Sequence, residues 1–210
     1  MLAGIVRTDA GSVELDGKDL KRLSAQERAK RIAYLPQHRP LAWPVKVRDV
    51  VALGRFAHGA ALGRLRESDQ LAVDKAIAAC DLNHLANRRT DTLSGGEVAR
   101  VHFARALAGQ APLLLADEPI AALDPRQYLR ITQLLREFVD RGGGAVVVLH
   151  DVALAARFAH RLVWMHSGKV VVTGSPEETL NEAIMGQVYG VNARIEKDPL
   201  GFSVKIDSAR

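Results

Sequence analysis

The sequence predicts an α/β fold built on a doubly wound, mainly parallel sheet. Two short apolar runs, residues 113–116 and 145–149, contain no charge and are bounded by turn residues. Such runs are typical of strands that are buried on both faces of a parallel sheet. Segments with helical spacing follow them at 126–141 and 152–160. The alternation of strand and helix is the pattern of an α/β domain.

Shorter elements are expected on either side of these runs. Ser24 followed by Glu27 is a capping-box pattern that predicts a short basic helix to about residue 30. Further helices are expected over 47–53, where Gly54 ends the helix, and over 67–80, where Leu71 and Ile77 lie on the apolar face. The remaining predicted elements are an exposed strand within 11–17, a strand over 32–35, a helix over 94–108 and a terminal hairpin around 198–201.

The charge balance argues against a nucleic-acid partner. The 210 residues carry a net charge of +5, which is mild for this length. A nucleic-acid-binding surface needs its basic residues concentrated on one face. The densest basic stretch, residues 18–31, also contains Asp19 and Glu27 and no interleaved aromatic residues. We therefore expect a solvated surface there, although contact with anionic lipid or with a membrane partner stays open.

A cytoplasmic protein is expected. The single cysteine, Cys80, lies in a helical pattern and is predicted to be a small core residue, so no disulfide framework is possible. No stretch approaches the about 18 apolar residues of a membrane span. The first seven residues lack the charged start of a signal peptide. Any contact with a membrane is therefore expected to pass through a partner.

Polar residues follow both apolar strands at the point where ligands bind in open α/β sheets, beyond the carboxyl ends of the strands. Asp117 and Glu118 follow the first strand, and His150 and Asp151 follow the second. Carboxylates directly after a wholly apolar strand are costly unless they hold a metal or take part in chemistry. The alternative is that they only cap the helices that follow.

A second candidate site is the sequence Leu-Ser-Gly-Gly-Glu at residues 93–97, directly ahead of the predicted helix. Paired glycines at a helix start allow backbone N–H groups to crowd together, and the helix dipole adds positive potential. This arrangement suits a phosphate. The alternative is a plain N-cap by Ser94 with a flexible lead-in.

In combination these motifs make the chain resemble the ATP-binding-cassette (ABC) ATPase family. Residues 93–97 match its signature motif and residues 113–118 are similar to its Walker B strand. Residues 122–124 match its D-loop, His150 its switch histidine and Gln37 its Q-loop glutamine. The resemblance covers essentially the whole chain. It implies a single P-loop NTPase-like domain over 1–210, with a helical signature subdomain at about 38–109, a small antiparallel β part and a C-terminal hairpin at about 192–206.

The resemblance implies ATP and Mg²⁺ as cofactors and assigns catalytic roles. Asp117 would hold Mg²⁺ through its water shell, and Gln37 would touch the metal or the water. Glu118 would polarise the attacking water, as a carboxylate within hydrogen-bond reach can. His150 would donate a hydrogen bond to the γ-phosphate.

The resemblance also implies a head-to-tail homodimer that sandwiches two nucleotides. The nucleotide-binding residues carried over from the signature motif are Ser94, Gly95, Gly96 and Glu97. Backbone and side-chain donors of this motif would clasp the γ-phosphate of ATP held by the opposite subunit. Asp124 would act across the same interface.

The family's Walker A loop, Gly-x-x-x-x-Gly-Lys-[Ser/Thr], does not occur in the sequence. Residues 1–14 resemble the stretch that closes the Walker A helix and enters the next strand. One expectation is an N-terminally truncated chain, from a fragment or from a start assigned too late. The other is a short protein that binds nucleotide poorly and serves as a non-catalytic interaction subunit. The intact mass of the protein made by its own cell separates the two.

The segment 34–55, above all Val-Ala-Leu-Gly-Arg at 51–55, resembles importers of ferric siderophores, haem and cobalamin. The expected partners are permease subunits and, indirectly, a periplasmic or surface binding protein. The expected location is the cytoplasmic face of the membrane, and Trp43 is either a core residue or part of the surface that meets the permease. A soluble ABC protein that acts on nucleic acid or the ribosome is the alternative, although neither a second cassette nor a long coiled coil is present.

Overall fold

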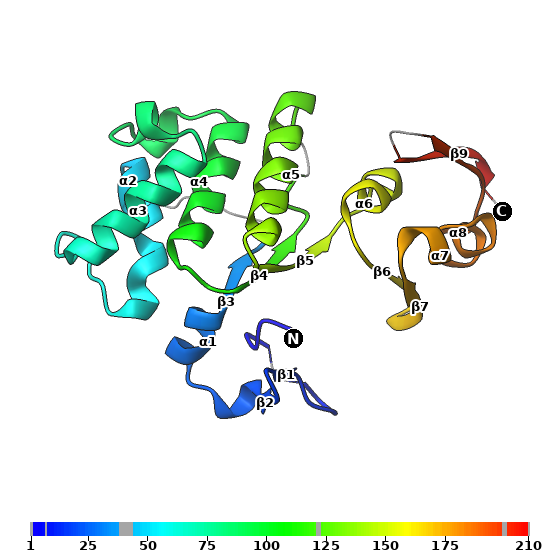
Figure 1. The fold of residues 1–210 in the computed structure, drawn as a ribbon, viewed down its shortest axis with the longest axis horizontal. Coiled ribbons are helices and arrows are strands. Elements are labelled where there is room, and N and C mark those ends of the chain that lie inside the picture. Colours follow the sequence, from blue (N-terminus) through cyan, green and yellow to red (C-terminus); the bar gives the residue numbers. More distant parts are fainter. Residues whose placement is uncertain (1, 7, 38–43, 121–122, 199–200, 210) are drawn as a thin grey trace. The chain divides into compact units, whose positions relative to one another are not determined.

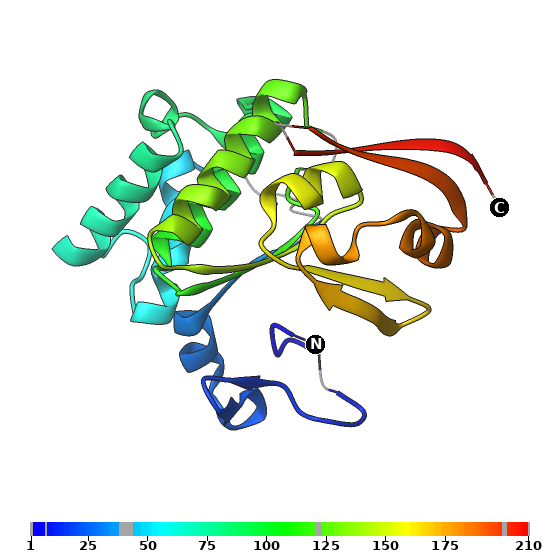
Figure 2. The same cartoon turned by 45° about the vertical axis from the view of Figure 1, so that its right-hand side comes forward.

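The computed structural model describes residues 2–6, 8–37, 44–120, 123–198 and 201–209. The chain consists of two compact units, residues 1–148 and 149–210, and each is described by itself. Figures 1 and 2 show the elements of both units along the chain. The assignment of the whole chain to one domain stays a prediction.

A three-stranded parallel sheet lies at the centre of the first unit. Its strands are β3 (Ile32–Leu35), β4 (Leu113–Asp117) and β5 (Gly144–Val148), in the order β3-β4-β5. Figure 1 shows β4 between the other two. Leu35 pairs with Ala116, which in turn pairs with Val147. The predicted strands and their parallel pairing are therefore confirmed.

Helices cover one face of this sheet. They are α2 (Val47–Ala52), η2 (Leu53–His58), α3 (Glu67–Ala79), α4 (Gly95–Ala108) and α5 (Pro125–Asp140), with short turns η3 (Asn83–Leu85) and η4 (Thr90–Thr92) between them. Their apolar side chains form one core with alternate residues of the sheet, among them Leu35, Leu114 and Ala116. Because strand side chains alternate between faces, these three point to the helical side.

The other face of the sheet is covered only in part. The hairpin β1 (Glu14–Leu15) and β2 (Lys18–Asp19) and the turn η1 (Leu20–Arg22) pack there, with Leu20 and Leu23 against Ile32 and Leu115. Helix α1 (Ala25–Arg31) leads into β3 and contacts η2, where the Gln26 side-chain amide donates to the Ala57 carbonyl at 2.9 Å. Within the described part of the chain, Val146 and Val148 of β5 remain 47 % and 50 % exposed. Burial on both faces is confirmed for the central strand β4. It is wrong for β5, which forms the edge of the sheet.

Local sequence signals account for the boundaries of the first elements. Ser24 and Glu27 form the predicted capping box, with hydrogen bonds of 3.2 and 2.7 Å, and α1 begins at the next residue after Ser24. The exposed strand expected within 11–17 is confined to β1. The chain then turns at Asp16 and Gly17, whose φ angles of 51° and 72° are those of a tight hairpin turn.

Helix α3 buries the face that carries Ile77, as predicted, but Leu71 does not lie on it. Its buried apolar residues are Ala72, Val73, Ala76 and Ile77, which follow the i, i+1, i+4, i+5 spacing of one helical face. Leu71 lies off this face and is 54 % exposed, so its placement in the core is wrong.

Gly54 has a different role from the helix stop that was predicted. Helix α2 runs directly into the 3₁₀ turns of η2, and the chain leaves the helical path only at Gly59, which has a φ of 83°. A Cβ atom at Gly54 would collide with the backbone oxygen of Arg105 in α4. A glycine is therefore required here so that η2 can lie against α4.

The next residue, Arg55, forms a buried ion pair. Its side chain lies 2.8 Å from the carboxylate of Asp69 in α3, and both residues are more than nine-tenths buried. Arg55 also donates to the Ala108 carbonyl at the end of α4 (2.9 Å) and to the Gln110 side chain (2.8 Å). The hydrogen bond from Arg55 lowers the pKa of the Asp69 carboxyl. We refer to these four residues as the Arg55 latch; they join η2, α3 and the end of α4.

Removal of one partner of the Arg55 latch should destabilise the first unit. Arg55→Met leaves the Asp69 carboxylate shielded from water without its cation, so the loss of unfolding free energy should exceed that of an exposed ion pair. Urea unfolding measures this loss. Because the pKa of Asp69 is lowered in the folded chain, the contribution is present above its ordinary pKa and is lost as the pH falls.

Two further variants test the same interpretation. Arg55→Met with Asp69→Leu removes both charges and should regain most of the stability. Arg48→Met is the matched control, since Arg48 forms an exposed pair with Asp74 at 2.8 Å and should change stability by about 1 kcal/mol or less. Equal losses from Arg55→Met and Arg48→Met would contradict a buried latch.

Cys80 lies in the core at the end of α3, as predicted. It is fully buried, and burial raises the pKa of its thiol to about 12. The thiolate, which is the reactive form, is therefore almost absent at neutral pH.

The native chain should resist alkylation at Cys80. At pH 8 iodoacetamide should modify it at least about 100 times more slowly than an exposed cysteine, because a thiol in water has a pKa of about 8.5. Mass spectrometry after timed quenching measures the rate. The same reaction in urea should be fast, and rapid modification of the folded chain would contradict the buried placement.

The second unit contains α6 (Val152–Phe158), β6 (Leu162–His166), β7 (Lys169–Gly174), α7 (Pro176–Thr179), α8 (Glu182–Tyr189), β8 (Val191–Asp198) and β9 (Gly201–Ala209). Trp164, Leu180 and Met185 are central to its core. The Trp164 indole N–H donates to the Thr179 hydroxyl at 3.0 Å. The predicted terminal hairpin is confirmed as β8-β9, with strands longer than expected. The β6-β7 hairpin and helices α7 and α8 were not predicted.

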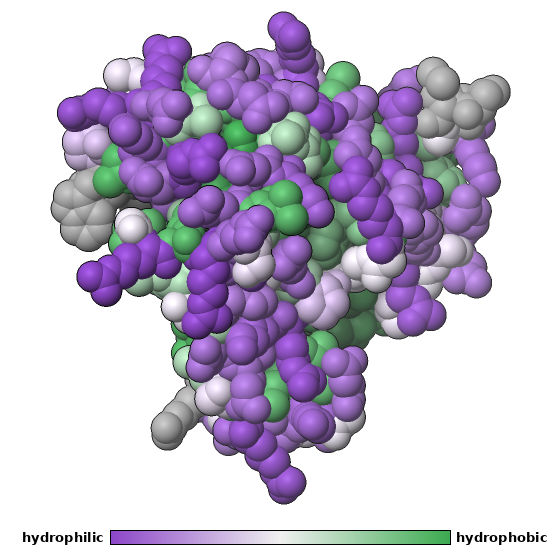
Figure 3. Space-filling view, turned by 60° about the vertical axis from the view of Figure 1, so that its left-hand side comes forward, coloured by the Kyte–Doolittle hydropathy of each residue, from purple (hydrophilic) through white to green (hydrophobic). Residues whose placement is uncertain are grey.

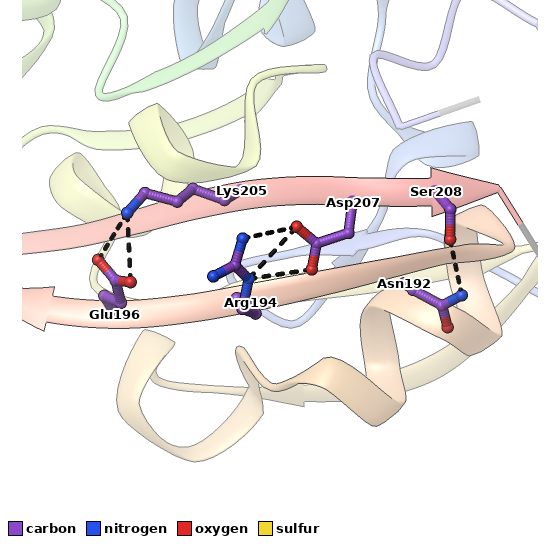
Figure 4. A network of polar contacts seen from close by, with 6 residues as sticks. All are labelled: Asn192, Arg194, Glu196, Lys205, Asp207 and Ser208. Atoms are coloured by element: carbon purple, nitrogen blue, oxygen red, sulfur yellow. Dashed lines mark hydrogen bonds and ion pairs between the residues drawn. The ribbon is translucent and has the colours of Figure 1, made fainter.

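The β8-β9 hairpin carries a row of polar pairs on its exposed side (Figure 4). Arg194 contacts Asp207 at 2.8 Å, Lys205 contacts Glu196 at 3.1 Å and Asn192 contacts Ser208 at 2.9 Å. Exposed pairs of this kind contribute little to stability. They give the hairpin a hydrated outer surface.

None of the helices that the structure describes is both long enough and apolar enough to cross a membrane. Figure 3 shows a face of the molecule that is mostly hydrophilic, with apolar side chains in small groups.

Candidate functional site

The carboxyl end of the central strand carries two acidic residues. Asp117 is the last residue of β4 and Glu118 follows it, and both are half-buried. The Glu118 backbone N–H donates to the Val148 carbonyl at 3.1 Å, so the chain stays attached to β5 as it leaves the sheet. Glu118 has a φ of 45°. A positive φ is uncommon for a residue with a side chain and is concentrated at functional sites.

Gln37 lies at the same edge of the sheet. β3 ends at Leu35, whose partner Ala116 immediately precedes Asp117. The exposed Gln37 therefore follows the neighbouring strand at the level where the two carboxylates follow β4. The register thus puts Gln37, Asp117 and Glu118 at one edge of the sheet, and their shared role stays a prediction.

These donors fit a magnesium ion that is shared with a phosphate ligand. Mg²⁺ prefers oxygen donors, keeps several waters and is commonly held by one or two carboxylates together with substrate phosphates. The Asp117 carboxylate and the Gln37 amide oxygen meet this description. Among the described residues no group of three or more His, Cys, Asp or Glu is placed to hold a metal by itself.

Ser94 caps α4, as the alternative interpretation of a plain N-cap expected. Its hydroxyl accepts from the Glu97 N–H at 3.3 Å, and the Glu97 carboxylate accepts from the Ser94 N–H at 2.7 Å. The hydrogen bonds from Ser94 lower the pKa of the Glu97 carboxyl. The Glu97 carboxylate is thus occupied by the cap, and the anion site at the start of this helix stays a prediction.

The two glycines of this motif have different surroundings. Gly95 is exposed, and a Cβ built on it would meet nothing within 4 Å. Gly96 is buried, and its Cβ would lie 2.5–2.8 Å from the side chain of Gln127 in α5. Gln127 therefore covers the buried side of the motif and leaves the Gly95 side open.

Asp124 caps helix α5. Its carboxylate accepts from the Gln127 N–H at 2.9 Å, and Pro125 occupies the first helical position. Ala122, the first residue of the D-loop match, lies outside the described residues, as do His38 and Trp43. The capping role of Asp124 was open from sequence, and its predicted role across a dimer interface stays a prediction.

Sequence reasoning missed Gln127, although a signal was present. Asp-x-x-Gln is a capping-box pattern, in which the residue at the third helical position reaches back to the cap. In α1, α4 and α7 a glutamate at this position completes the box. The Gln127 side chain lies against Gly96 instead, a contact between distant segments that spacing alone does not reveal.

His150 belongs to the second unit. It is exposed and directly precedes Asp151, whose carboxylate caps α6 by accepting from the Leu154 N–H at 2.9 Å. The alternative interpretation from sequence, that this carboxylate caps the following helix, thus holds for Asp151. The role of His150 toward a phosphate stays a prediction.

The site residues of the first unit form two groups. Gln37, Asp117 and Glu118 lie at the carboxyl edge of the sheet. The starts of α4 and α5 form the other group, where Gly96 and Asp124 are joined through Gln127.

Comparison with known proteins gives a consistent family. Residues 1–121 match the family model described as ABC transporter. The hemin import ATP-binding protein HmuV of Pseudomonas entomophila (strain L48) is 40 % identical over 203 residues, which cover 94 % of this chain and 78 % of that protein.

Two solved structures are also similar. The ADP conformation of MJ1267, an ATP-binding cassette of an ABC transporter, has a TM-score of 0.77 at 21 % identity and covers 90 % of this chain and 80 % of its own. The dimeric post-hydrolysis state of the cassette MJ0796, bound to ADP and phosphate, has a TM-score of 0.69 at 28 % identity, with 83 % and 77 % covered. The first supports the fold alone. From the family match and the relative's identity and coverage, this chain belongs to the ABC transporter family.

Proposed function

We propose that this chain is the ATP-hydrolysing subunit of an importer that takes up haem or a related iron chelate. The observation that carries the proposal is the pair Asp117–Glu118 at the end of a buried central strand, with Gln37 beside it. The 40 % identity to a hemin import ATP-binding protein supports the direction and the substrate class.

Hydrolysis of ATP at this edge needs a positioned water and neutralised phosphate charge. The Glu118 carboxylate would accept the proton of the attacking water, because it projects from the turn that follows β4. Asp117 and Gln37 would hold Mg²⁺, which supplies charge neutralisation at the phosphates. His150 would donate to the γ-phosphate.

The start of α4 would serve the nucleotide of a second copy. Ser94 and Gly95 are exposed at a helix N-terminus, where orphan N–H groups and the helix dipole favour a phosphate. Glu97 holds this turn through the capping box, and Asp124 lies at the start of the neighbouring helix. A head-to-tail homodimer would therefore place each motif against the ATP of the other subunit, as a cassette bound to ADP and phosphate is dimeric in a related structure.

The transporter would be completed by partners. Two copies would bind permease subunits at the cytoplasmic face of the membrane, and a binding protein would deliver the chelate on the other side. Since none of the described helices can cross a membrane, the contact with the bilayer would pass through the permease.

Glu118→Gln should abolish turnover and stabilise an ATP-bound dimer. The amide keeps the size of the side chain but cannot accept the proton of water, so ATP would remain bound. Loss of at least about 100-fold in kcat is expected for removal of a general base. Phosphate release and size-exclusion chromatography with MgATP measure the two effects on the protein as its own cell produces it.

Glu14→Gln is the matched control, because Glu14 is an exposed residue of β1. It should leave turnover and the elution volume unchanged. Undiminished hydrolysis by Glu118→Gln would overturn the assigned role of Glu118. Lack of ATP binding by the unaltered protein at millimolar MgATP would favour the non-catalytic subunit.

The substrate class has its own test. A strain in which the chromosomal gene carries Glu118→Gln should grow poorly when haem is the only iron source and normally on free iron. Growth yield over several generations measures the difference. Equal growth on haem would contradict haem as the substrate and would leave the ATPase assignment intact.

A further inference from the structure

We propose that Gln127 is a positioning residue that holds the start of α4 in the geometry needed to clasp a phosphate. The inference rests on the proposed function, since it assigns a partner inside the chain to the signature motif. It concerns the described contact between Gln127 in α5 and Gly96 in α4.

The contact is closer than a side chain at position 96 allows. A Cβ atom on Gly96 would lie 2.5 Å from Cγ, 2.6 Å from Cδ and 2.8 Å from Oε1 of Gln127. Real Cβ atoms do not approach other heavy atoms this closely, so a side chain at position 96 would force the Gln127 side chain out of its place. Gly95, which meets nothing within 4 Å, has no such requirement.

The two glycines therefore have separate purposes. The open side of Gly95 leaves space for a ligand or a partner subunit to approach the backbone. The buried side of Gly96 is filled by Gln127, which fixes where that backbone lies. Gly95 thus leaves room for a ligand, and Gly96 leaves room for the Gln127 side chain.

Gln127 acts through packing. In the part of the chain that the structure describes, its buried side-chain oxygen has no hydrogen-bond partner. A hydrogen bond to this oxygen therefore does not determine the side-chain position. An apolar side chain of the same length should hold Gly96 equally well.

Gln127 is itself held by Asp124. The backbone N–H of Gln127 donates to the Asp124 carboxylate at 2.9 Å, at the start of α5. A chain of direct contacts thus runs from the Asp124 cap through Gln127 to Gly96. The same residue therefore takes part in the cap of α5 and in the packing against the first turn of α4.

A double-mutant cycle tests the contact. Gly96→Ala should lower the Tm by about 3–8 °C, because the added methyl group overlaps Gln127. Gly96→Ala combined with Gln127→Ala should recover most of this loss, since the space is then empty. Gly95→Ala is the matched control and should leave the Tm unchanged or slightly higher. If Gly96→Ala lowered the Tm equally in the original chain and in the Gln127→Ala chain, the proposal would be overturned.

A kinetic comparison tests the positioning role. In the protein as its own cell produces it, Gln127→Ala should raise KM for MgATP about threefold to tenfold, because a loosened motif loses part of its preorganisation. Gln127→Met should restore the KM, since its length preserves the packing. Gln133→Ala, an exposed glutamine of the same helix, should change neither constant.

The outcomes separate this inference from the proposed function. An unchanged KM in Gln127→Ala, or a failure of Gln127→Met to restore it, would overturn the positioning role. The trapping of a dimer by Glu118→Gln does not depend on that result. If Glu118→Gln traps no dimer while the Tm values show the expected coupling between Gly96 and Gln127, the packing contact is confirmed and the assigned ATPase activity is contradicted.

Discussion

The pairing of β4 between β3 and β5 is the constraint on which the first unit depends. A central parallel strand has no edge and little contact with water, so its residues are apolar until it ends. The first position that tolerates charge is therefore the end of the strand, where Asp117 and Glu118 lie. The same requirement that builds the core gathers the chemical groups at one edge of the sheet.

Sequence predicted best what depends on nearby residues. The cap at Ser24, the cap at Ser94 and the ends of β3 and β4 follow from local spacing, and the structure has them where they were expected. The position of the polar residues at the strand ends could also be predicted, because parallel strands end at a common edge of the sheet.

Contacts between distant segments could not be predicted in this way. Gly54 lies where a glycine commonly ends a helix. Its close contact is with the backbone oxygen of Arg105, some fifty residues later in the chain. Leu71 fits an apolar face by composition, and only the position of α4 decides which face of α3 is buried. Gln127 fits a capping box, and the proximity of Gly96 gives its side chain another place.

Helix α4 is held at both of its ends by side chains from other helices. Gln127 of α5 lies against its first turn, and Arg55 of η2 bonds to the carbonyl of its last residue. These contacts tie the first turn of α4 to α5 and its last residue to η2. A change at α5 or at η2 therefore acts directly on one end of the helix whose first residue is the exposed Gly95.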